Sequence, residues 1–128
     1  MKLSEHFDDK EFFHKDTYQL IISSSHAPAW HISPLLINRL EKIREHFGKP
    51  IHINSGFRTQ SENIIAGSIQ MFSMHQYGIA ADIHIDGVEP KEIFDFVKKT
   101  WTSGGVGIYN TFIHIDVRNS RSLIQWTA

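Results

Sequence analysis

Two histidines and two aspartates lie close together in the segment SMHQYGIAADIHID, residues 73–86, among small and apolar side chains. They are His75, Asp82, His84 and Asp86. The surrounding residues suit a buried strand, in which a charged group is unfavourable unless a partner compensates it. A metal ion is one such partner, and histidine is the commonest metal ligand in proteins. The types and spacing of these residues thus indicate metal or acid–base chemistry.

A later strand-like segment, FIHIDVR at 112–118, carries a second pair of such residues, His114 and Asp116. Side chains at positions i and i+2 of a strand share a face, so these two point the same way. The same rule places Asp82 and His84 on one face of their own strand. If the two strands are neighbours in a sheet and these faces are aligned, the imidazoles and carboxylates converge.

His75 precedes Asp82 by seven residues, and Gly78 between them allows the chain to turn back toward the strand. His75, Asp82 and a histidine from the other strand would together offer two imidazoles and one carboxylate. Three such ligands with one open position are typical of a catalytic zinc site. Iron, manganese and cobalt accept the same ligand types, so the pattern does not select the metal.

The alternation also has a simpler interpretation, because polar residues at every second position often line a solvated face of a sheet. A solvated strand edge accounts for His84 and Asp86 without any metal. His52, flanked by Ile51 and Ile53, can be read as a hydrogen-bonded strand histidine. Residue types and spacing alone leave both interpretations open.

Local signals predict the elements that position these residues. Ser33 is a suitable helix N-cap, Pro34 suits the first turn, and Gly48 ends the same helix. Similar signals predict helices at residues 33–48, 59–67 and 90–101, and short strands at 50–54, 79–85, 104–109 and 112–118, the last two joined as a hairpin. This order predicts an α+β fold with a small, mainly antiparallel sheet and helices packed on one side.

The bulk composition limits the classes of function. The 128 residues suit one domain, residues 1–128, which can bury a core without disulfides. The net charge of −1 gives no electrostatic footprint for nucleic acid or an anionic membrane, and the absence of cysteine excludes thiolate ligands. We expect no membrane span, because no apolar run approaches about 18 residues. Acidic residues in MKLSEHFDDKEFF predict that there is no signal peptide.

Three motifs occur in the order SGFRTQSEN, SMHQYGIAAD and GGVGIYNTFIHIDVR, after an N-terminal LSEHFDDKEF. Together they resemble, over nearly the whole chain, the M15 zinc peptidases, in particular D-alanyl-D-alanine carboxypeptidase-like and phage endolysin domains. The resemblance implies a Hedgehog/DD-peptidase-like fold and one Zn²⁺ ion held by His75, Asp82 and His114. It also implies that Arg58 holds a substrate carboxylate or carbonyl, for which its two-pronged guanidinium is suited.

Other positions keep more than one interpretation. Ser73 either hydrogen-bonds a ligand or supports its own loop, and Arg58 could instead be a surface or helix-capping residue. Several relatives carry an acid three residues before the last histidine ligand or a second histidine two residues before it, where this chain has Thr111 and Phe112. We therefore nominate Asp116 as the general base or as a carboxylate that orients a ligand.

We expect a zinc metallopeptidase that hydrolyses amide bonds in peptidoglycan stem peptides, as a D-Ala-D-Ala carboxypeptidase or an L,D-endopeptidase. Zinc would polarise the scissile carbonyl and activate water. The alternative is a non-catalytic zinc-binding module that recognises cell-wall peptide or a protein partner. A metal hydrolase for a non-peptide substrate is a third possibility. We expect a monomer that acts on the cell wall and is either cytoplasmic until released, like a phage lysin, or virion-associated.

Overall fold

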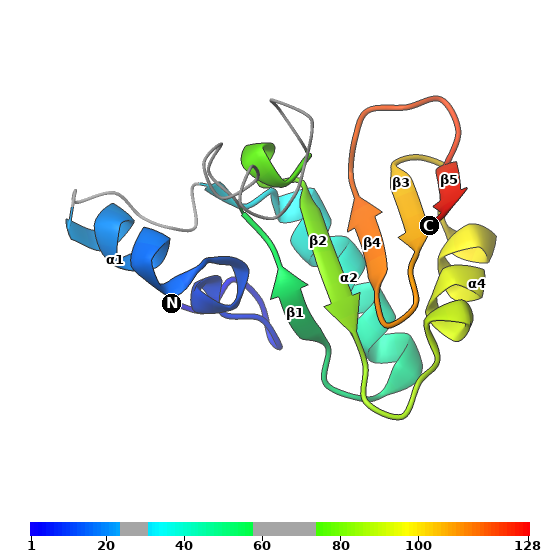
Figure 1. Ribbon diagram of the computed structural model, residues 1–128, viewed down its shortest axis with the longest axis horizontal. Coiled ribbons are helices and arrows are strands. Elements are labelled where there is room, and N and C mark those ends of the chain that lie inside the picture. The colour runs from blue at the N-terminus through cyan, green and yellow to red at the C-terminus, as the bar shows by residue number, and fades with distance from the viewer. Residues whose placement is uncertain (24–30, 58–73) are drawn as a thin grey trace.

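The computed structural model describes residues 1–23, 31–57 and 74–128, which form an α+β fold around one five-stranded sheet (Figure 1). The strand order is β1-β2-β4-β3-β5, and only the β3–β5 pair is parallel, which confirms the predicted mainly antiparallel sheet. The described elements are η1 (Asp9–Phe12), α1 (Lys15–Ser23), α2 (Pro34–Phe47), β1 (His52–Ser55), η3 (Met74–Tyr77), β2 (Ala80–His84), α4 (Pro90–Thr100), β3 (Gly105–Ile108), β4 (Ile113–Asp116) and β5 (Ile124–Thr127).

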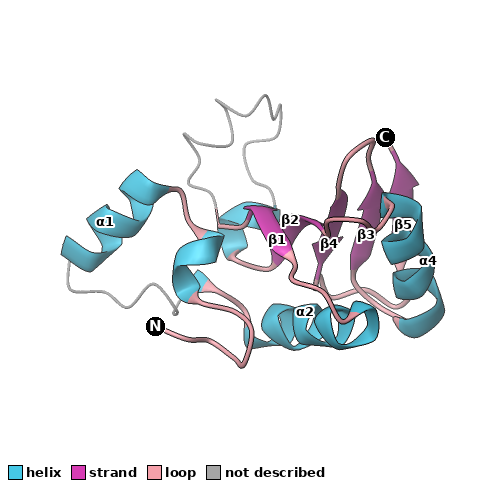
Figure 2. Cartoon of the chain, turned by 90° about the horizontal axis from the view of Figure 1, so that it is seen from below, coloured by secondary structure: helices cyan, strands magenta, loops and turns pink. Residues whose placement is uncertain are grey.

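The hydrophobic core lies between one face of the sheet and the helices α2 and α4. Figure 2 shows α2 lying along one side of the strands, while α1 extends away from the sheet. Side chains from both helices and from the central strands form one buried cluster, which includes Leu36, Leu40, Ile43, Ile83, Ile93, Val97, Val106, Ile113 and Ile115. Burial of each such side chain contributes roughly 1.5–3 kcal/mol, so this face is fixed toward the helices. The predicted packing of helices on one side is thus confirmed.

Helix α2 begins and ends where its capping residues predict. The Ser33 side chain accepts a hydrogen bond from the Leu36 backbone N–H, and Pro34 occupies the first turn. Gly48 has a φ of 65° and donates its backbone N–H to Arg44 O, which closes the last turn. This left-handed conformation is accessible to glycine at little cost, so the helix ends there.

The strand register sets which polar residues face each other. Strands β2 and β4 pair antiparallel with Asp82 opposite His114 and Ala80 opposite Asp116. Strands β3 and β4 form the predicted hairpin, in which the Tyr109 N–H donates to Phe112 O at 3.0 Å. Because alternate β2 residues face the core, Asp82 and His84 project from the other face of the sheet.

Some elements differ from those predicted. The strands are one or two residues shorter at several ends, and the predicted helix at 59–67 lies outside the described residues. Helix α1 and strand β5 were not predicted, because most of their side chains are exposed and their apolar patterns are weak. No helix within the described ranges is long and apolar enough to cross a membrane.

Candidate metal centre

A tight turn carries His75 back to strand β2. Gly78 follows η3 with a φ of 68°, and its N–H donates to His75 O at 3.2 Å. The Gly78 carbonyl accepts the Ser33 N–H at 2.9 Å, which fixes the turn against the start of α2. A side chain at Gly78 would collide with the His31 backbone, so both the φ angle and the space require glycine here. The turn predicted at Gly78 is therefore present.

Three potential ligands meet on the face of the sheet opposite the core. Asp82 Oδ1 lies 3.0 Å from His114 Nδ1 and 3.4 Å from His75 Nε2. One ligand atom from each residue lies within 4.8 Å of the other two. The three residues are buried, with exposed fractions of 5% for His75, 8% for Asp82 and 9% for His114. The structure thus brings together the three residues named as ligands from the sequence.

Each histidine is oriented through its other ring nitrogen. His75 Nδ1 lies 2.7 Å from the Gly56 carbonyl, which can only accept, so this nitrogen carries the proton and Nε2 faces Asp82. His114 donates Nε2–H to Asp116 Oδ2 at 2.8 Å, and its Nδ1 faces Asp82. Metal-binding histidines commonly have such a partner, which fixes the tautomer and the ring orientation. The two nitrogens that face inward are therefore the ones available to a metal.

Asp116 is fully buried beside His114, and hydrogen bonds occupy its carboxylate. It accepts bonds from Arg118 Nε at 2.8 Å, Arg118 Nη2 at 2.7 Å and the Arg118 backbone N–H at 3.1 Å. Burial alone would raise the pKa of Asp116, but the hydrogen bonds from Arg118 and His114 outweigh it and lower that pKa well below its ordinary value. A strongly acidic carboxyl with these partners is a weak proton acceptor and a good anchor for the His114 ring.

The charges of the centre are mutually stabilised. Burial raises the pKa of Asp82, but its contacts with the His114 and His75 rings outweigh burial and lower that pKa well below its ordinary value, so the carboxylate is ionised. Burial also lowers the pKa of His114, yet Asp116 and Asp82 on its two sides produce a net rise. Two imidazoles and an ionised carboxylate suit zinc, and three protein ligands leave one tetrahedral position for water or substrate. The donor set therefore fits a zinc ion.

The aromatic side chain of Trp126, on β5, packs beside His114. The Trp126 ring lies 5.1 Å from the His114 ring, and the Arg118 guanidinium lies 5.4 Å from the Trp126 centroid. Trp126 Nε1 donates to Tyr109 Oη at 3.1 Å. A side chain at Gly107 would collide with the indole, so this glycine allows the close approach. Sequence reasoning missed Trp126 because β5 was not predicted, although the alternation in LIQWT could have indicated a strand.

Not all residues singled out in the sequence belong to this centre. His84 shares a face of β2 with Asp82 and Asp86 lies in the turn after this strand, but both gather with His52 in a second group. Arg58 and Ser73 lie outside the described residues, so their roles as substrate-binding residues stay predictions.

The chain belongs to the peptidase M15 family, because the family model matches residues 5–116. The match contains His75, Asp82, His114 and Asp116, whereas β5 lies beyond its end. No curated protein sequence matches the chain. Family membership supports a hydrolase of the metallopeptidase type with a peptide substrate, and peptidases of this family are typically zinc-dependent. The buried group described above is where the chain could hold such an ion.

Proposed function

We propose that the protein is a zinc-dependent peptidase that hydrolyses amide bonds in peptidoglycan stem peptides containing D-amino acids. The observation that carries the proposal is the convergence of His75, Asp82 and His114, with ligand atoms within 4.8 Å of one another, in a chain of the peptidase M15 family. A single zinc ion held there would supply Lewis-acid activation of the scissile carbonyl and of water.

The surrounding residues of the chain would prepare this chemistry by fixing the ligands. Asp82 supplies the negative charge that the two imidazoles lack. In the neutral rings, the Gly56 carbonyl favours the proton of His75 on Nδ1 and Asp116 favours that of His114 on Nε2, so both inward nitrogens would offer lone pairs to a metal. We assign Asp116 as a positioning residue rather than the general base, because Arg118 occupies its carboxylate and lowers its pKa.

We further propose that Arg58 binds a carboxylate or carbonyl of the substrate and that Ser73 contributes a hydrogen bond. Support for Arg58 comes from its position in the chain, two residues after Gly56, whose carbonyl contacts His75. A guanidinium near the centre could bind a peptide carboxylate through two parallel hydrogen bonds.

The test is turnover of purified muropeptides by the zinc-loaded full chain, with and without a chelator. We expect cleavage beside a D-amino acid that is lost on chelation, and the cleaved bond would separate carboxypeptidase from endopeptidase activity. Asp82→Ala and His75→Ala should abolish turnover, whereas His14→Ala, which changes an exposed histidine just before α1, should leave it unchanged. A zinc-loaded sample that cleaves no cell-wall peptide would overturn the enzyme assignment.

A second candidate is a non-catalytic zinc module that binds cell-wall peptide. Thr111 stands where several relatives have an acid, and Asp116 is engaged by Arg118, which favours this alternative. Binding of muropeptide to the zinc-loaded chain without any product would support it. Binding that depends on Arg58 but is followed by cleavage would exclude it.

A further inference from the structure

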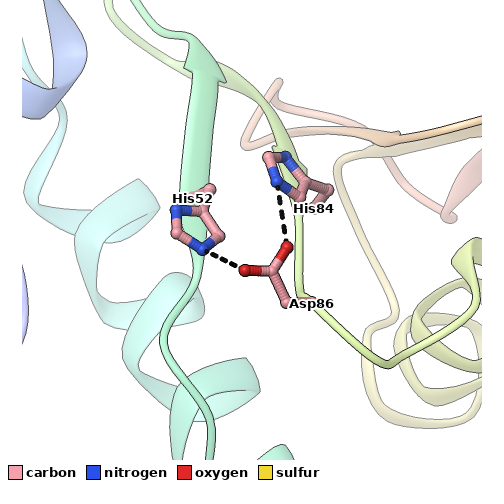
Figure 3. Close-up of side chains that lie close together, drawn as sticks. All are labelled: His52, His84 and Asp86. Atoms are coloured by element: carbon pink, nitrogen blue, oxygen red, sulfur yellow. Dashed lines mark hydrogen bonds and ion pairs between the residues drawn. The ribbon is translucent and has the colours of Figure 1, made fainter.

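A second group of potential metal ligands lies at the edge of the sheet, outside the centre described above. His52 on β1, His84 at the end of β2 and Asp86 just after it converge there, as Figure 3 shows. We propose that these three side chains form a second, solvent-accessible site for a divalent transition metal of the zinc, nickel or copper class. Imidazole ligands favour these metals over magnesium or calcium.

The sheet register brings the two histidines together. Strands β1 and β2 pair antiparallel with His52 directly opposite His84. Residues opposite each other on one face of a sheet have Cβ atoms roughly 5 Å apart. The two rings stack with centroids 4.7 Å apart and an interplanar angle of 17°. The backbone therefore fixes the pair before any ion arrives.

The Asp86 carboxylate lies close to the Nε2 atoms of both histidines. Asp86 Oδ2 lies 3.1 Å from His52 Nε2, and Asp86 Oδ1 lies 3.6 Å from His84 Nε2 (Figure 3). One ligand atom from each residue lies within 4.8 Å of the others. This arrangement offers two imidazole nitrogens and one carboxylate oxygen, the same donor types as the buried centre.

Asn54 orients one of these ligands, which is an observation independent of the cluster itself. Its Oδ1 accepts a hydrogen bond from His84 Nδ1, so the proton of the neutral ring lies on Nδ1 and the lone pair of Nε2 faces Asp86. Asn54 lies where the β1–β2 register shifts, between Ile53 and Ser55, and its side chain reaches His84 from this irregularity. Such a partner is typical of a metal-binding histidine.

The second site differs from the buried centre in its access to solvent. The exposed fractions of the side chains are 49% for His52, 40% for His84 and 81% for Asp86. Water can therefore complete the coordination, and we expect weaker binding than at the buried centre. His84 and Asp82 share a face two residues apart, which corresponds to roughly 7 Å along the strand. The second ion would therefore lie on the same face of the sheet as the first.

The test measures binding of Zn²⁺ and Cu²⁺ to the full chain and does not depend on catalysis. The wild-type protein, loaded with one equivalent of zinc, is titrated with further metal by calorimetry. A His75→Ala/His114→Ala variant, shown to be folded by circular dichroism, is titrated in parallel. We expect the zinc-loaded wild type to bind one further ion more weakly than the first. The double variant should bind a single ion, with the affinity of that weaker ion. Copper bound to this variant should show two nitrogen ligands by electron paramagnetic resonance.

Substitutions at the second site identify where the weaker ion binds. We expect Asn54→Ala to weaken this binding by about tenfold and His52→Ala or His84→Ala to weaken it further. His14→Ala and His46→Ala remove exposed histidines elsewhere in the chain and should leave the affinity for the weaker ion unchanged. The proposal is overturned if wild type takes up only one ion, or if the weaker ion binds equally well without His52 and His84. A protein that binds the second ion but cleaves no muropeptide would leave this proposal standing while the peptidase proposal fails.

Discussion

His114 lies between two carboxylates, and its two ring nitrogens have different partners. Nε2 donates to Asp116 at 2.8 Å, and Nδ1 lies 3.0 Å from Asp82. Arg118 in turn holds Asp116 through its side chain and its backbone N–H. The tautomer of His114 therefore depends on Asp116 and, through it, on Arg118, neither of which is a candidate ligand. We expect a change at Asp116 to alter the affinity for the metal.

Replacement of Asp116 tests this dependence. We expect Asp116→Ala to weaken zinc binding by roughly 10–100-fold, because the His114 ring loses the partner that fixes its tautomer. Asp116→Asn should lose less, since its amide oxygen can still accept from Nε2. Competition with a chromophoric chelator measures the affinity. Asp95→Asn on the exposed face of α4 is the matched control, and equal affinity in Asp116→Ala and the control would contradict the assigned role.

At the scale of single elements, strand β5 contributes Trp126, which packs beside the candidate metal centre formed on the other strands. Trp126 packs on His114, donates to Tyr109 and lies over Arg118. These contacts join β5 to β3 and β4 through side chains as well as through the parallel backbone pairing.

Truncation of Trp126 should therefore weaken this end of the sheet. We expect Trp126→Ala to lower the free energy of unfolding by about 1–3 kcal/mol, because a half-buried indole loses its apolar contacts. Chemical denaturation measures the change. Ile124→Ala, which removes an exposed side chain from the same strand, should stay within about 0.5 kcal/mol of wild type. Equal effects of the two substitutions would show that the indole contacts contribute little.

Helix α2 also holds the N-terminal segment, through Glu41. Its carboxylate accepts hydrogen bonds from the Ser4 hydroxyl and the His6 backbone N–H, and it lies 2.7 Å from His6 Nδ1. Burial raises the pKa of Glu41, but these hydrogen bonds outweigh it, so the pKa is lowered from 4.5. A lowered folded-state pKa means that the ionised form stabilises the fold above about pH 4.5 and that this stabilisation is lost as the pH falls through the folded-state value.

Because the folded-state pKa of Glu41 is lowered, the stability lost in Glu41→Ala should depend on pH. At pH 7 we expect the variant to be less stable by about 1–2 kcal/mol, since hydrogen bonds to a charged group contribute up to about 3 kcal/mol. The difference from wild type should shrink as the pH is lowered below 4.5. Urea unfolding at several pH values measures it, with the exposed Glu45→Ala on the same helix as the control. A difference that grows toward acid would contradict the proposed contribution.

At the scale of the whole molecule, metal binding should stabilise the fold, because the buried ligands converge only in the folded chain. An ion present at about 100 times its dissociation constant adds about 2.7 kcal/mol to the free energy of unfolding. We therefore expect zinc to raise the thermal midpoint of the wild type and a chelator to reverse the rise. Differential scanning calorimetry measures it. His75→Ala should show a much smaller response, and an equal response in both proteins would place the stabilising ion elsewhere.

The features that could be predicted from the sequence rest on short-range signals. Ser33 and Gly48 delimit α2 through their own hydrogen bonds and φ angle, and alternation placed Asp82 and His114 on polar strand faces. The features that could not be predicted depend on the register between strands and on which distant side chains become hydrogen-bond partners. His52 meets His84 only because of how β1 pairs with β2, and local pattern alone did not identify Arg118 as the partner of Asp116.

The contact between the Gly56 carbonyl and the His75 ring joins residues that are 19 positions apart in the chain. The same strand end is also anchored from the other side, because the Phe57 N–H donates to Phe12 O at 2.7 Å. A side chain at Gly56 would also collide with the Phe12 backbone, so the two segments pack closely at this point. The carbonyl that orients the His75 ring is therefore positioned by the N-terminal segment, so a substitution that displaces Phe12 should disturb a candidate metal ligand with which Phe12 itself has no hydrogen bond.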